Sequence, residues 1–450
     1  MSDAIALVAL TTADLDAYLA NGSERARRWV ASQQFKAQPL THCSVPDEHG
    51  GIAEVLVGVA NGHDLGTLAH LPQQLPPGNY TLVDRGLKLD AGRVALGFAL
   101  GSYQFTRYKA PRREPAKLLA PLGHYLDEVA ALAAATTRTR DLVNTPTEHM
   151  GPADLGDAAR AIATRFGAGY REWIGNELLD ANFPAIHAVG RASHRAPRLI
   201  EVLAGDPAHP EIVIVGKGVC FDTGGLDIKA ADGMRHMKKD MGGAAHAIAL
   251  AELVLERRLP IRLRLLVPAV ENAISANAYR PGEVIRTRSG LTVEIDNTDA
   301  EGRVILCDAL AYAAESKPHL IIDFATLTGA ARIALGPDLP ALFGNDEALR
   351  DQLAGIGRDV QDPMWPMPLW QPYLAMLESG IADLANSGAS RHAGAITAAL
   401  YLQRFVPPNI PWLHLDTYAW NDTERPGRPR GGEAMGLRAV FELLKRNYAG

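Results

Sequence analysis

Residues 297–303 read NTDAEGR and place two carboxylates and a guanidinium, Asp299, Glu301 and Arg303, at alternate positions. In an extended segment alternate side chains point to one face, so the three groups could converge on one spot. Two like charges on one face repel each other unless something cationic lies between them, as a metal ion would. The same letters also fit a helix start, because Thr298 and Glu301 match the S/T-x-x-E capping box and an apolar run with helical spacing follows. The heptapeptide alone supports both interpretations.

A second group of charged side chains follows a predicted strand. The apolar run EIVIVGKG leads into a glycine-rich stretch, residues 219–245, and Lys217, Asp222, Lys229 and Asp240 stand in or beside it. Glycines there allow tight turns and a close approach of the backbone to a ligand. Phosphate binding is disfavoured, because neither G-x-x-x-x-G-K-[ST] nor G-x-G-x-x-G is present at this strand end.

Asp222, Asp240, Asp299 and Glu301 together supply four carboxylates from predicted strand ends, with no cysteine and no evident histidine pair among them. Such an oxygen-rich set suits Mg, Mn or a zinc pair bridged by carboxylates. Two metal ions need more ligands than one, and bridging carboxylates meet that need at a separation of roughly 3.5–4 Å. Any one of these acids could be a solvated loop residue or a helix cap, but four at strand ends favour a metal centre.

The larger part of the chain alternates predicted strands with predicted helices. The strands are PRLIEVLAG, EIVIVGKGV, RLRLLVPAV, LIIDFATLTGA and WLHLDTYAW, and the helices are AAHAIALAELVLERR, the segment after NTDAEGR and AITAALYLQRFV. Nearly continuous apolar strands separated by helices indicate a mostly parallel sheet covered on both faces. Ligands of such sheets bind beyond the carboxyl ends of the strands, which is where the acidic residues stand.

The first 120 residues indicate a smaller domain. Short apolar runs at 53–60 and 78–84 accompany helical stretches such as AGRVALGFALGSYQF, and the Pro-rich, basic stretch 108–123 is expected to be an exposed connection. The sequence HYLDEVAALAAATTRTRDLVNTP then predicts a long helix that Pro146 ends. The predicted fold class is α/β, with a small N-terminal α/β domain over 1–123, a linking helix over 124–146 and a larger domain with a mostly parallel, helix-covered sheet over 147–450.

Composition restricts the compartment and the partners. The 450 residues carry a formal net charge of -6 without a long Lys/Arg run, so nucleic acid is not an expected partner. Cys43, Cys220 and Cys307 are few and far apart, which favours a reducing compartment and argues against a disulfide framework or a cysteine zinc site. The N-terminus lacks the basic region of a signal peptide, and no stretch approaches the ~18 apolar residues of a membrane span. We expect a soluble cytoplasmic protein with no membrane partner.

Four motifs resemble the leucyl aminopeptidase family of dinuclear metallo-exopeptidases. They are VGKGVCFDTGGLDIK, MKKDMGGAA, NTDAEGR and DFATLTGA, and NTDAEGR is the signature of that family. The likeness covers residues from about 144 to 420, whereas over the first 120 residues only the layout is similar. The resemblance implies a cytosolic, metal-dependent hydrolase that releases the N-terminal residue, leucine-like with broad tolerance, from peptides. It also identifies 147–450 as the catalytic metallo-aminopeptidase domain.

The resemblance assigns metal ligands by position. It implies two divalent metal ions per subunit, Zn or Mn with Mg possible, that activate a bridging water. Asp222 and Glu301 would bridge the two ions, Lys217 and Asp240 would complete one of them, and Asp299 would hold the other. A lysine ligand must be a neutral amine, so the dications must depress the pKa of Lys217.

Two further residues would act in the reaction that the resemblance implies. Lys229 would polarise the scissile carbonyl and stabilise the developing oxyanion. Arg303 would hold a bicarbonate anion that serves as general base for the bridging water, and a helix that starts after the motif would favour the same anion. On this interpretation the carboxylates of NTDAEGR bind cations and its arginine binds an anion, while the capping box could form as well.

The resemblance also implies a substrate pocket and an assembly. By position, Met237, Thr326, Leu327 and Gly329 should line the pocket for the first side chain, although a methionine considered alone is more often a core residue. The family implies a homohexamer, which nothing in the sequence itself indicates.

The chain departs from the family at two places. Ala393 stands where the family commonly has glycine, and TYAW follows WLHLD in place of the family's DIAG stretch, with no ATGFGVR-like ending. The metal ligands are unaffected, but side-chain specificity and subunit contacts do not carry over there. The alternative function is a catalytically silent structural or DNA-binding relative, which would show salt-sensitive duplex binding without peptide hydrolysis.

Overall fold

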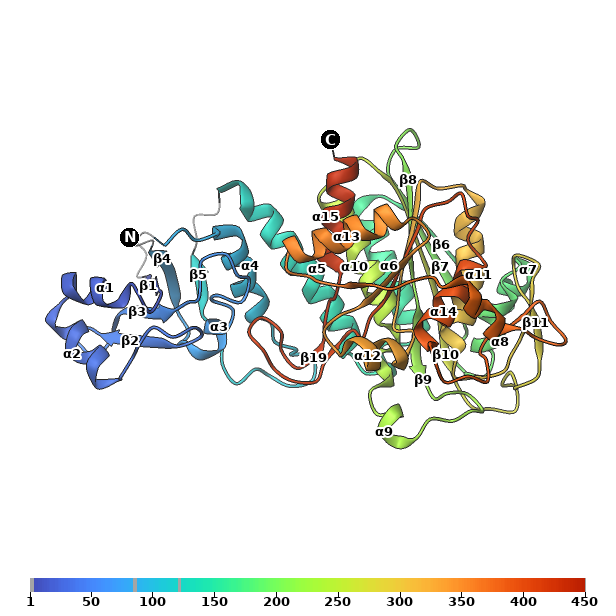
Figure 1. The fold of residues 1–450 in the computed structure, drawn as a ribbon, viewed down its shortest axis with the longest axis horizontal. Coiled ribbons are helices and arrows are strands. Elements are labelled where there is room, and N and C mark those ends of the chain that lie inside the picture. The colour runs from blue at the N-terminus through green and yellow to red at the C-terminus, as the bar shows by residue number, and fades with distance from the viewer. Residues whose placement is uncertain (1–3, 84–86, 120–122, 450) are drawn as a thin grey trace. The chain divides into compact units, whose positions relative to one another are not determined.

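The computed structural model, which describes residues 4–83, 87–119 and 123–449, contains two compact units (Figure 1). The N-terminal unit consists of Met1–Thr137 and Thr423–Arg430, and the large unit consists of Arg138–Asp422 and Gly431–Gly450. The division falls inside helix α5 (Leu126–Asn144), which forms within the segment predicted as the linking helix. Residues 1–3, 84–86 and 120–122 of the predicted N-terminal domain, and residue 450 of the predicted catalytic domain, lie outside the described residues.

The N-terminal unit contains a five-stranded sheet in the order β2-β3-β1-β4-β5, parallel except for the β2–β3 pair. Its strands are β1 (Ile5–Leu10), β2 (His42–Pro46), β3 (Ile52–Gly58), β4 (Asn79–Val83) and β5 (Lys117–Leu119), and its helices before α5 are α1 (Leu15–Asn21), α2 (Glu24–Ser32), α3 (Leu71–Gln74) and α4 (Ala91–Gly101). The segment 108–123, predicted as an exposed connection, also forms a strand, β5, whose end residues Lys117 and Leu119 are exposed. There the main chain pairs with β4, which the Pro-rich composition did not indicate.

Alternating side chains of this sheet pack into two separate hydrophobic cores. Leu7 of β1 packs in a cluster with Leu71 of α3 and Phe98 of α4, whereas its neighbour Val8 packs with Val30 of α2. Successive strand residues point to opposite faces, so α3 and α4 cover one face and α1 and α2 the other. The N-terminal unit therefore has its own hydrophobic interior.

The large unit contains a nine-stranded sheet in the order β15-β14-β17-β13-β8-β10-β7-β6, with β9 paired to β10. The central pairs are parallel, as predicted, but β7 runs antiparallel to β10, β6 to β7 and β14 to β17. The strands of this unit are β6 (Gly169–Ile174), β7 (Arg198–Ala204), β8 (Glu211–Gly216), β9 (Gly218–Asp222), β10 (Arg262–Asn272), β11 (Val284–Arg286), β12 (Thr292–Glu294), β13 (Leu320–Ala325), β14 (Ala341–Gly344), β15 (Trp365–Pro366), β16 (Leu384–Ala385), β17 (Trp412–Asp416), β18 (Trp420–Asn421) and β19 (Gly431–Gly432).

Helices cover both faces of the large sheet, which confirms the predicted α/β fold class (Figure 1). Val213 and Val215 of β8 pack in one cluster with residues of α8, α11 and α14, whereas the other face of β8 contacts α10, which in turn contacts α6 and α15. A short 3-10 helix, η1 (Gly123–Tyr125), directly precedes α5. The helices after α5 are η2 (Thr147–His149), α6 (Pro152–Phe166), α7 (Glu177–Asp180), α8 (Pro184–Gly190), α9 (Ala231–Met234), η3 (Met237–Met241), α10 (Gly242–Glu256), α11 (Glu301–Glu315), α12 (Gly329–Leu335), α13 (Glu347–Asp359), η4 (Gln371–Leu377), α14 (Gly394–Gln403) and α15 (Leu437–Tyr448).

Hydropathy along the helices bears on the question of a membrane. In the described part of the chain, no helix has both the length and the apolar character that crossing a bilayer requires.

Candidate metal centre

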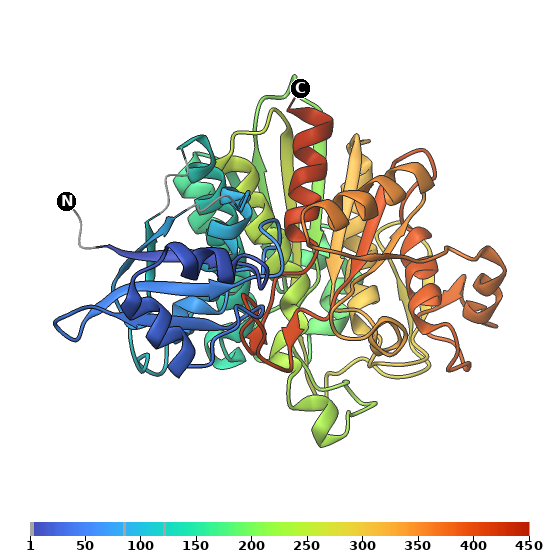
Figure 2. The same ribbon diagram turned by 60° about the vertical axis from the view of Figure 1, so that its left-hand side comes forward.

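The acidic side chains predicted as ligands gather at one edge of the large sheet. Strand β8 ends directly before Lys217 and β9 ends at Asp222, after which the glycine-rich loop with α9 projects from that edge (Figures 1 and 2). Asp240 lies in η3 immediately before α10, and Glu301 is the first residue of α11. Parallel strands bring these separate segments together at their carboxyl ends.

One half of the cluster is organised around Lys217. Its Nζ lies 2.8 Å from Oδ2 of Asp240 and 2.9 Å from Oε1 of Glu301, and it donates a hydrogen bond of 2.9 Å to the carbonyl oxygen of Thr326. All three charged side chains are buried. Burial by itself would lower the pKa of Lys217, but Asp240, Glu301 and Asp222 together raise it. An amine ligand needs the opposite direction, which positive charge bound to the same carboxylates would supply.

The other half is organised around Lys229. Its Nζ lies 2.7 Å from Oδ2 of Asp222 and also pairs with Oδ1 of Asp299. The second oxygen of Asp222 accepts hydrogen bonds from the backbone N–H of Gly224 (2.9 Å) and from Nδ2 of Asn272 (2.8 Å). These bonds hold the Asp222 carboxylate in one orientation, between the loop and strand β10.

Three of the carboxylates fit a divalent cation. Asp222, Asp299 and Glu301 each offer one oxygen, and these atoms all lie within 4.8 Å of one another. Burial, followed by the charge of Asp222, raises the pKa of Asp299 to about 6 and raises the pKa of Glu301 well above its ordinary value. Buried carboxylates in such proximity repel one another as anions, and a bound dication removes that penalty. Hard oxygen donors with one amine are a donor set for Zn, Mn or Mg.

The start of the NTDAEGR helix differs from the capping-box interpretation, which is wrong. The N-cap of α11 is Ala300, and no side chain caps the helix. Thr298 Oγ1 instead donates to the carbonyl oxygen of Gly224 (2.7 Å) and accepts from the N–H of Asp227 (2.9 Å). Thr298 therefore ties the motif to the glycine-rich loop, and Glu301 is free to face the cluster.

Two supporting residues were not identified from the sequence. Asn272, the last residue of β10, donates to Asp222 and also to the carbonyl oxygen of Thr298 (3.0 Å), and the hydroxyl of Tyr279 donates to the same oxygen (2.6 Å). Asn272 ends an apolar strand, which is the signal by which it could have been found. Tyr279 stands in a loop without such a signal.

Glycines let the elements approach closely at this edge. A Cβ at Gly302 would lie 2.4 Å from Cε and 2.7 Å from Nζ of Lys217. A Cβ at Gly243 would lie 2.1 Å from the carbonyl oxygen of Phe324, so the start of α10 packs directly on the backbone of β13. The glycines of NTDAEGR and MKKDMGGAA thus have a steric reason.

A cavity of about 400 Å³ opens over the cluster. All five predicted metal ligands and Lys229 line it, and so do the four predicted pocket residues, Met237, Thr326, Leu327 and Gly329. The loop after β13 that carries Leu327 is held by Asp416, the last residue of β17. Asp416 accepts hydrogen bonds from the N–H of Leu327 (2.9 Å) and from the N–H (3.2 Å) and hydroxyl (2.6 Å) of Thr328. Asp416 also ends a strand and was not identified from the sequence.

Arg303 lies apart from the other predicted residues. It is buried in α11, it is not among the residues that line the cavity, and Nη1 donates a hydrogen bond of 2.8 Å to the carbonyl oxygen of Asn386. Its Nε is buried and has no hydrogen-bond partner in the described part of the chain. Burial lowers the pKa of this guanidinium. A buried donor without an acceptor is a place where a small anion could bind.

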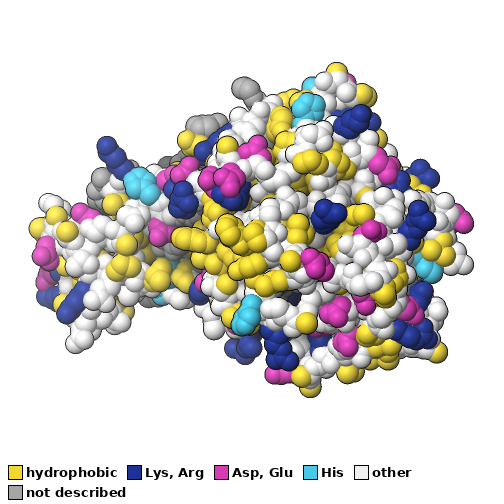
Figure 3. All heavy atoms as spheres, turned by 45° about the vertical axis from the view of Figure 1, so that its right-hand side comes forward, with side chains coloured by type: hydrophobic (Ala, Val, Ile, Leu, Met, Phe, Trp, Pro, Cys, Tyr) yellow, Lys and Arg dark blue, Asp and Glu magenta, His cyan; other side chains and the backbone are white. Residues whose placement is uncertain are grey.

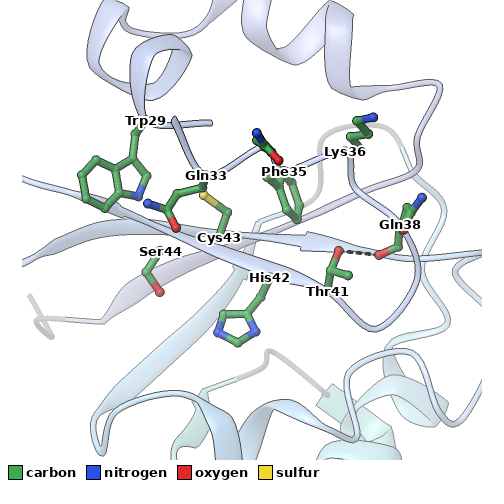
Figure 4. A pocket seen from close by; sticks show the side chains of 10 residues that line it. Trp29, Gln33, Phe35, Lys36, Gln38, Thr41, His42, Cys43 and Ser44 are labelled. Carbon is green, nitrogen blue, oxygen red and sulfur yellow. Dashed lines mark hydrogen bonds between the residues drawn. The ribbon is translucent and has the colours of Figure 1, made fainter. Parts of the chain in front are cut away.

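A second cavity, of about 460 Å³, lies in the N-terminal unit beside α2 and β2 (Figure 4). Trp29, Phe35 and Lys36 line it together with His42 and Cys43. None of the residues that line this cavity is acidic, so it does not compete with the large-unit cluster as a site for divalent metal ions.

Comparisons with known proteins assign both parts of the chain. Residues 137–441 match the cytosol aminopeptidase family, catalytic domain, and residues 5–121 match the M17 aminopeptidase N-terminal domain. A relative from Syntrophotalea carbinolica, named "Probable cytosol aminopeptidase", is 42% identical over 371 residues, which cover 78% of this chain and 74% of the relative.

Solved structures give the same result. The crystal structure of cytosol aminopeptidase from Coxiella burnetii has a TM-score of 0.96 and 48% identity and covers 100% of this chain and 98% of that chain. The bottromycin maturation enzyme BotP in complex with Mn has a TM-score of 0.88 and 32% identity, with 98% of this chain and 99% of that chain covered.

Proposed function

The chain belongs to the cytosol aminopeptidase family and is a metal-dependent aminopeptidase, and we propose a role for each residue of its site. The single observation that carries the proposal is the pair of lysine-centred carboxylate groups at one sheet edge, which meet through Asp222 and Glu301. Lys217 and Asp240 would hold one divalent ion, Asp299 would hold a second, and Asp222 and Glu301 would contact both. Bound there, the two ions would supply Lewis acidity and a water acidic enough to attack a peptide carbonyl near neutral pH.

Lys229 is the residue that we assign to the substrate carbonyl. Its ammonium is anchored by Asp222 and lines the cavity, and the carboxylates around it raise its pKa against the effect of burial, so it remains protonated. A fixed cation beside the scissile carbonyl stabilises the negative charge that develops on its oxygen. The position and charge of Lys229 support this role.

We assign Arg303 to a small anion such as bicarbonate, which would supply the general base when bound. The unpartnered, buried Nε supports this role, and so does the nearby first turn of α11, whose N–H groups favour negative charge. The hydrogen bond to Asn386 would keep the guanidinium in place. Met237, Thr326, Leu327 and Gly329 would surround the first side chain of the peptide.

We also propose that the enzyme self-associates, as a homohexamer. Hydrophobic side chains gather on the face drawn in Figure 3. Among the large apolar side chains described in the large unit, the most exposed are Ile333 (87%), Ile381 (66%), Ile228 (60%), Trp365 (55%) and Trp370 (55%). Exposed apolar surface of this kind marks contact sites. Sedimentation velocity at micromolar concentration should give a single species of six chains, and a monomer would contradict the proposal.

A cytoplasmic location is proposed on two grounds. Relatives carry the name cytosol aminopeptidase, and Cys43, Cys220 and Cys307 are buried and free, as expected in a reducing compartment. Cell fractionation that placed the protein outside the cytoplasm would contradict this.

The activity is tested by incubating the protein with Zn, Mn or Co and leucine p-nitroanilide. We expect release of p-nitroaniline that depends on metal and stops with a chelator. A protein with bound metal and no turnover would overturn the proposed roles. It would favour the silent or DNA-binding alternative, which the comparisons with aminopeptidases do not support.

A further inference from the structure

The wall of the cavity also carries two basic side chains, Lys239 and Arg332, beside the aromatic ring of Tyr418. Nζ of Lys239 lies 4.8 Å from the ring centroid of Tyr418, and Cζ of Arg332 lies 4.7 Å from the same centroid. All three residues line the cavity. Both distances are those of cation–π contacts, which hold a positive group against a ring.

Neither cation forms a salt bridge with a carboxylate of the described residues. In the described part of the chain, no carboxylate oxygen lies within 4.0 Å of the charged nitrogens of Lys239 or Arg332, although most arginines around the large sheet have such a partner. Asp416 is the acidic residue that lines the cavity near them, and it accepts hydrogen bonds from the backbone and hydroxyl of the loop after β13 instead. The wall therefore presents two basic side chains without a salt-bridge partner, and the carboxylates of Asp240 and Asp416 act on Lys239 only from a greater distance.

These cations stand next to the proposed pocket for the first side chain. Lys239 and Met237 both lie in η3, and Arg332 lies three residues after Gly329 in α12, which puts the two on one side of that helix. Tyr418 belongs to TYAW, which stands in place of the DIAG stretch of the leucyl aminopeptidase family. This departure from the family thus lies beside the position proposed for the first side chain.

We propose that this cavity selects peptides with an acidic N-terminal residue, aspartate or glutamate, whose side-chain carboxylate pairs with Arg332 and Lys239. The inference rests on the proposed function, because it assumes that the first residue of the peptide occupies this cavity. A guanidinium binds a carboxylate through two parallel hydrogen bonds, which gives both strength and orientation. A leucine side chain would instead desolvate the two cations without replacing the water that they lose.

The test compares kcat/KM for aspartyl and leucyl p-nitroanilide, using the full-length, metal-loaded enzyme. These substrates have no C-terminal carboxylate, so any effect of a cation on their ratio comes from the first side chain. We expect the aspartyl-to-leucyl ratio of kcat/KM to exceed one for the wild type. In Arg332→Leu this ratio should fall by about tenfold or more, because a site that hydrogen-bonds a polar group discriminates strongly against substrates that lack the group. A fall of less than about threefold would overturn the inference, and any larger fall supports it.

Matched variants separate charge from shape. Arg332→Lys keeps the charge and should retain a higher ratio than Arg332→Leu. The control Arg358→Leu removes an exposed arginine of α13 that does not line the cavity, so its ratio should equal that of the wild type. For Lys239→Met the metal content is also measured by elemental analysis, because Lys239 neighbours the proposed metal ligand Asp240. An equal fall in the control would overturn the inference.

A binding measurement provides a second readout. By isothermal titration, L-aspartate should bind the wild-type enzyme more tightly than L-leucine, and Arg332→Leu should lose that difference. If the metal-loaded wild type cleaves neither substrate, the proposed function itself fails. If it cleaves the leucyl substrate but the ratio and the binding difference ignore Arg332, only the acidic preference fails.

Discussion

Nζ of Lys229 and Oδ2 of Asp222 lie 2.7 Å apart, yet we expect removal of the two side chains to affect the enzyme in different ways. Asp222→Ala takes away a carboxylate shared by both proposed ions, so metal and activity should both be lost. Lys229→Ala removes no proposed ligand, so it should keep its metal while kcat falls by on the order of 10²–10³. Elemental analysis beside steady-state kinetics distinguishes them. A metal-free Lys229→Ala would show that the lysine supports the metal centre and not the carbonyl.

Arg303 poses a different question at the residue scale, because it is buried outside the cavity lining. If it holds bicarbonate as a base, Arg303→Ala should fold with its metal and lose activity by about 10²–10⁴-fold. The wild type should slow in degassed, bicarbonate-free buffer and recover when bicarbonate is added, whereas the variant should respond little.

An Arg303 that serves only the hydrogen bond to Asn386 gives another pattern. The variant would then lose stability, as measured by thermal unfolding, and wild-type activity would ignore bicarbonate. Arg303→Lys is the matched variant, since it keeps the charge but not the planar group that binds an oxyanion through two donors. Its partial recovery by bicarbonate would support the anion role.

At the scale of elements, the close approach of α11 to strand β8 depends on Gly302. A methyl group there would lie 2.4 Å from Cε of Lys217, a side chain that is buried and pinned between two carboxylates. Gly302→Ala should therefore displace the amine and weaken metal binding by about 10- to 100-fold, the usual effect of disturbing groups that orient ligands. Gly355→Ala in α13 is the control, since no backbone or carbon atom crowds that position. Metal titration that gave equal affinities for both variants would contradict this account.

A second element-scale prediction concerns Asp308 of α11, which caps a different helix. One carboxylate oxygen accepts from the N–H groups of Ala185 (2.8 Å) and Ile186 (3.4 Å) at the start of α8, and the other accepts from Arg288 N–H (2.8 Å). Asp308→Ala leaves these donors without an acceptor, so it should lower the free energy of unfolding by about 3 kcal/mol. Denaturant titration of the variant and the wild type measures the difference.

The pH dependence of that difference has a defined sign. Burial raises the pKa of Asp308 to about 7, above the ~3.9 of an unfolded chain. Between those values the folded state holds the proton more tightly, so the contribution of Asp308 to stability falls as the pH rises from about 4 to about 7. The destabilisation by Asp308→Ala should be larger at pH 5 than at pH 8. A difference that grew with pH would show that the three N–H groups outweigh burial.

The sequence predicted most elements of the large sheet, because long apolar strands and helical periodicity are local signals. It could not predict that β7 runs antiparallel to β10, since an apolar run looks the same in either direction. The prediction of a capping box was wrong because Thr298 Oγ1 donates its hydrogen bond to the carbonyl oxygen of Gly224, 74 residues away in the sequence, and does not cap its own helix. Asn272 and Asp416 escaped notice since each is a single polar residue at a strand end, whose partners only the fold brings near. The predicted metal ligands stand within sequence motifs, and for that reason they could be predicted from the sequence.

At the scale of the whole molecule, each unit has its own hydrophobic core, and the proposed metal ligands all belong to the large unit. A ligand stabilises the part of a protein that binds it, by about 2.7 kcal/mol when its concentration is 100 times its Kd. We therefore expect two calorimetric unfolding transitions, of which removal of metal by a chelator lowers the midpoint of one only. Asp222→Ala is the control, because its thermogram should already resemble that of the chelated wild type and should not respond to chelator. A chelator effect of equal size on both transitions, or on neither, would contradict a metal centre confined to the large unit.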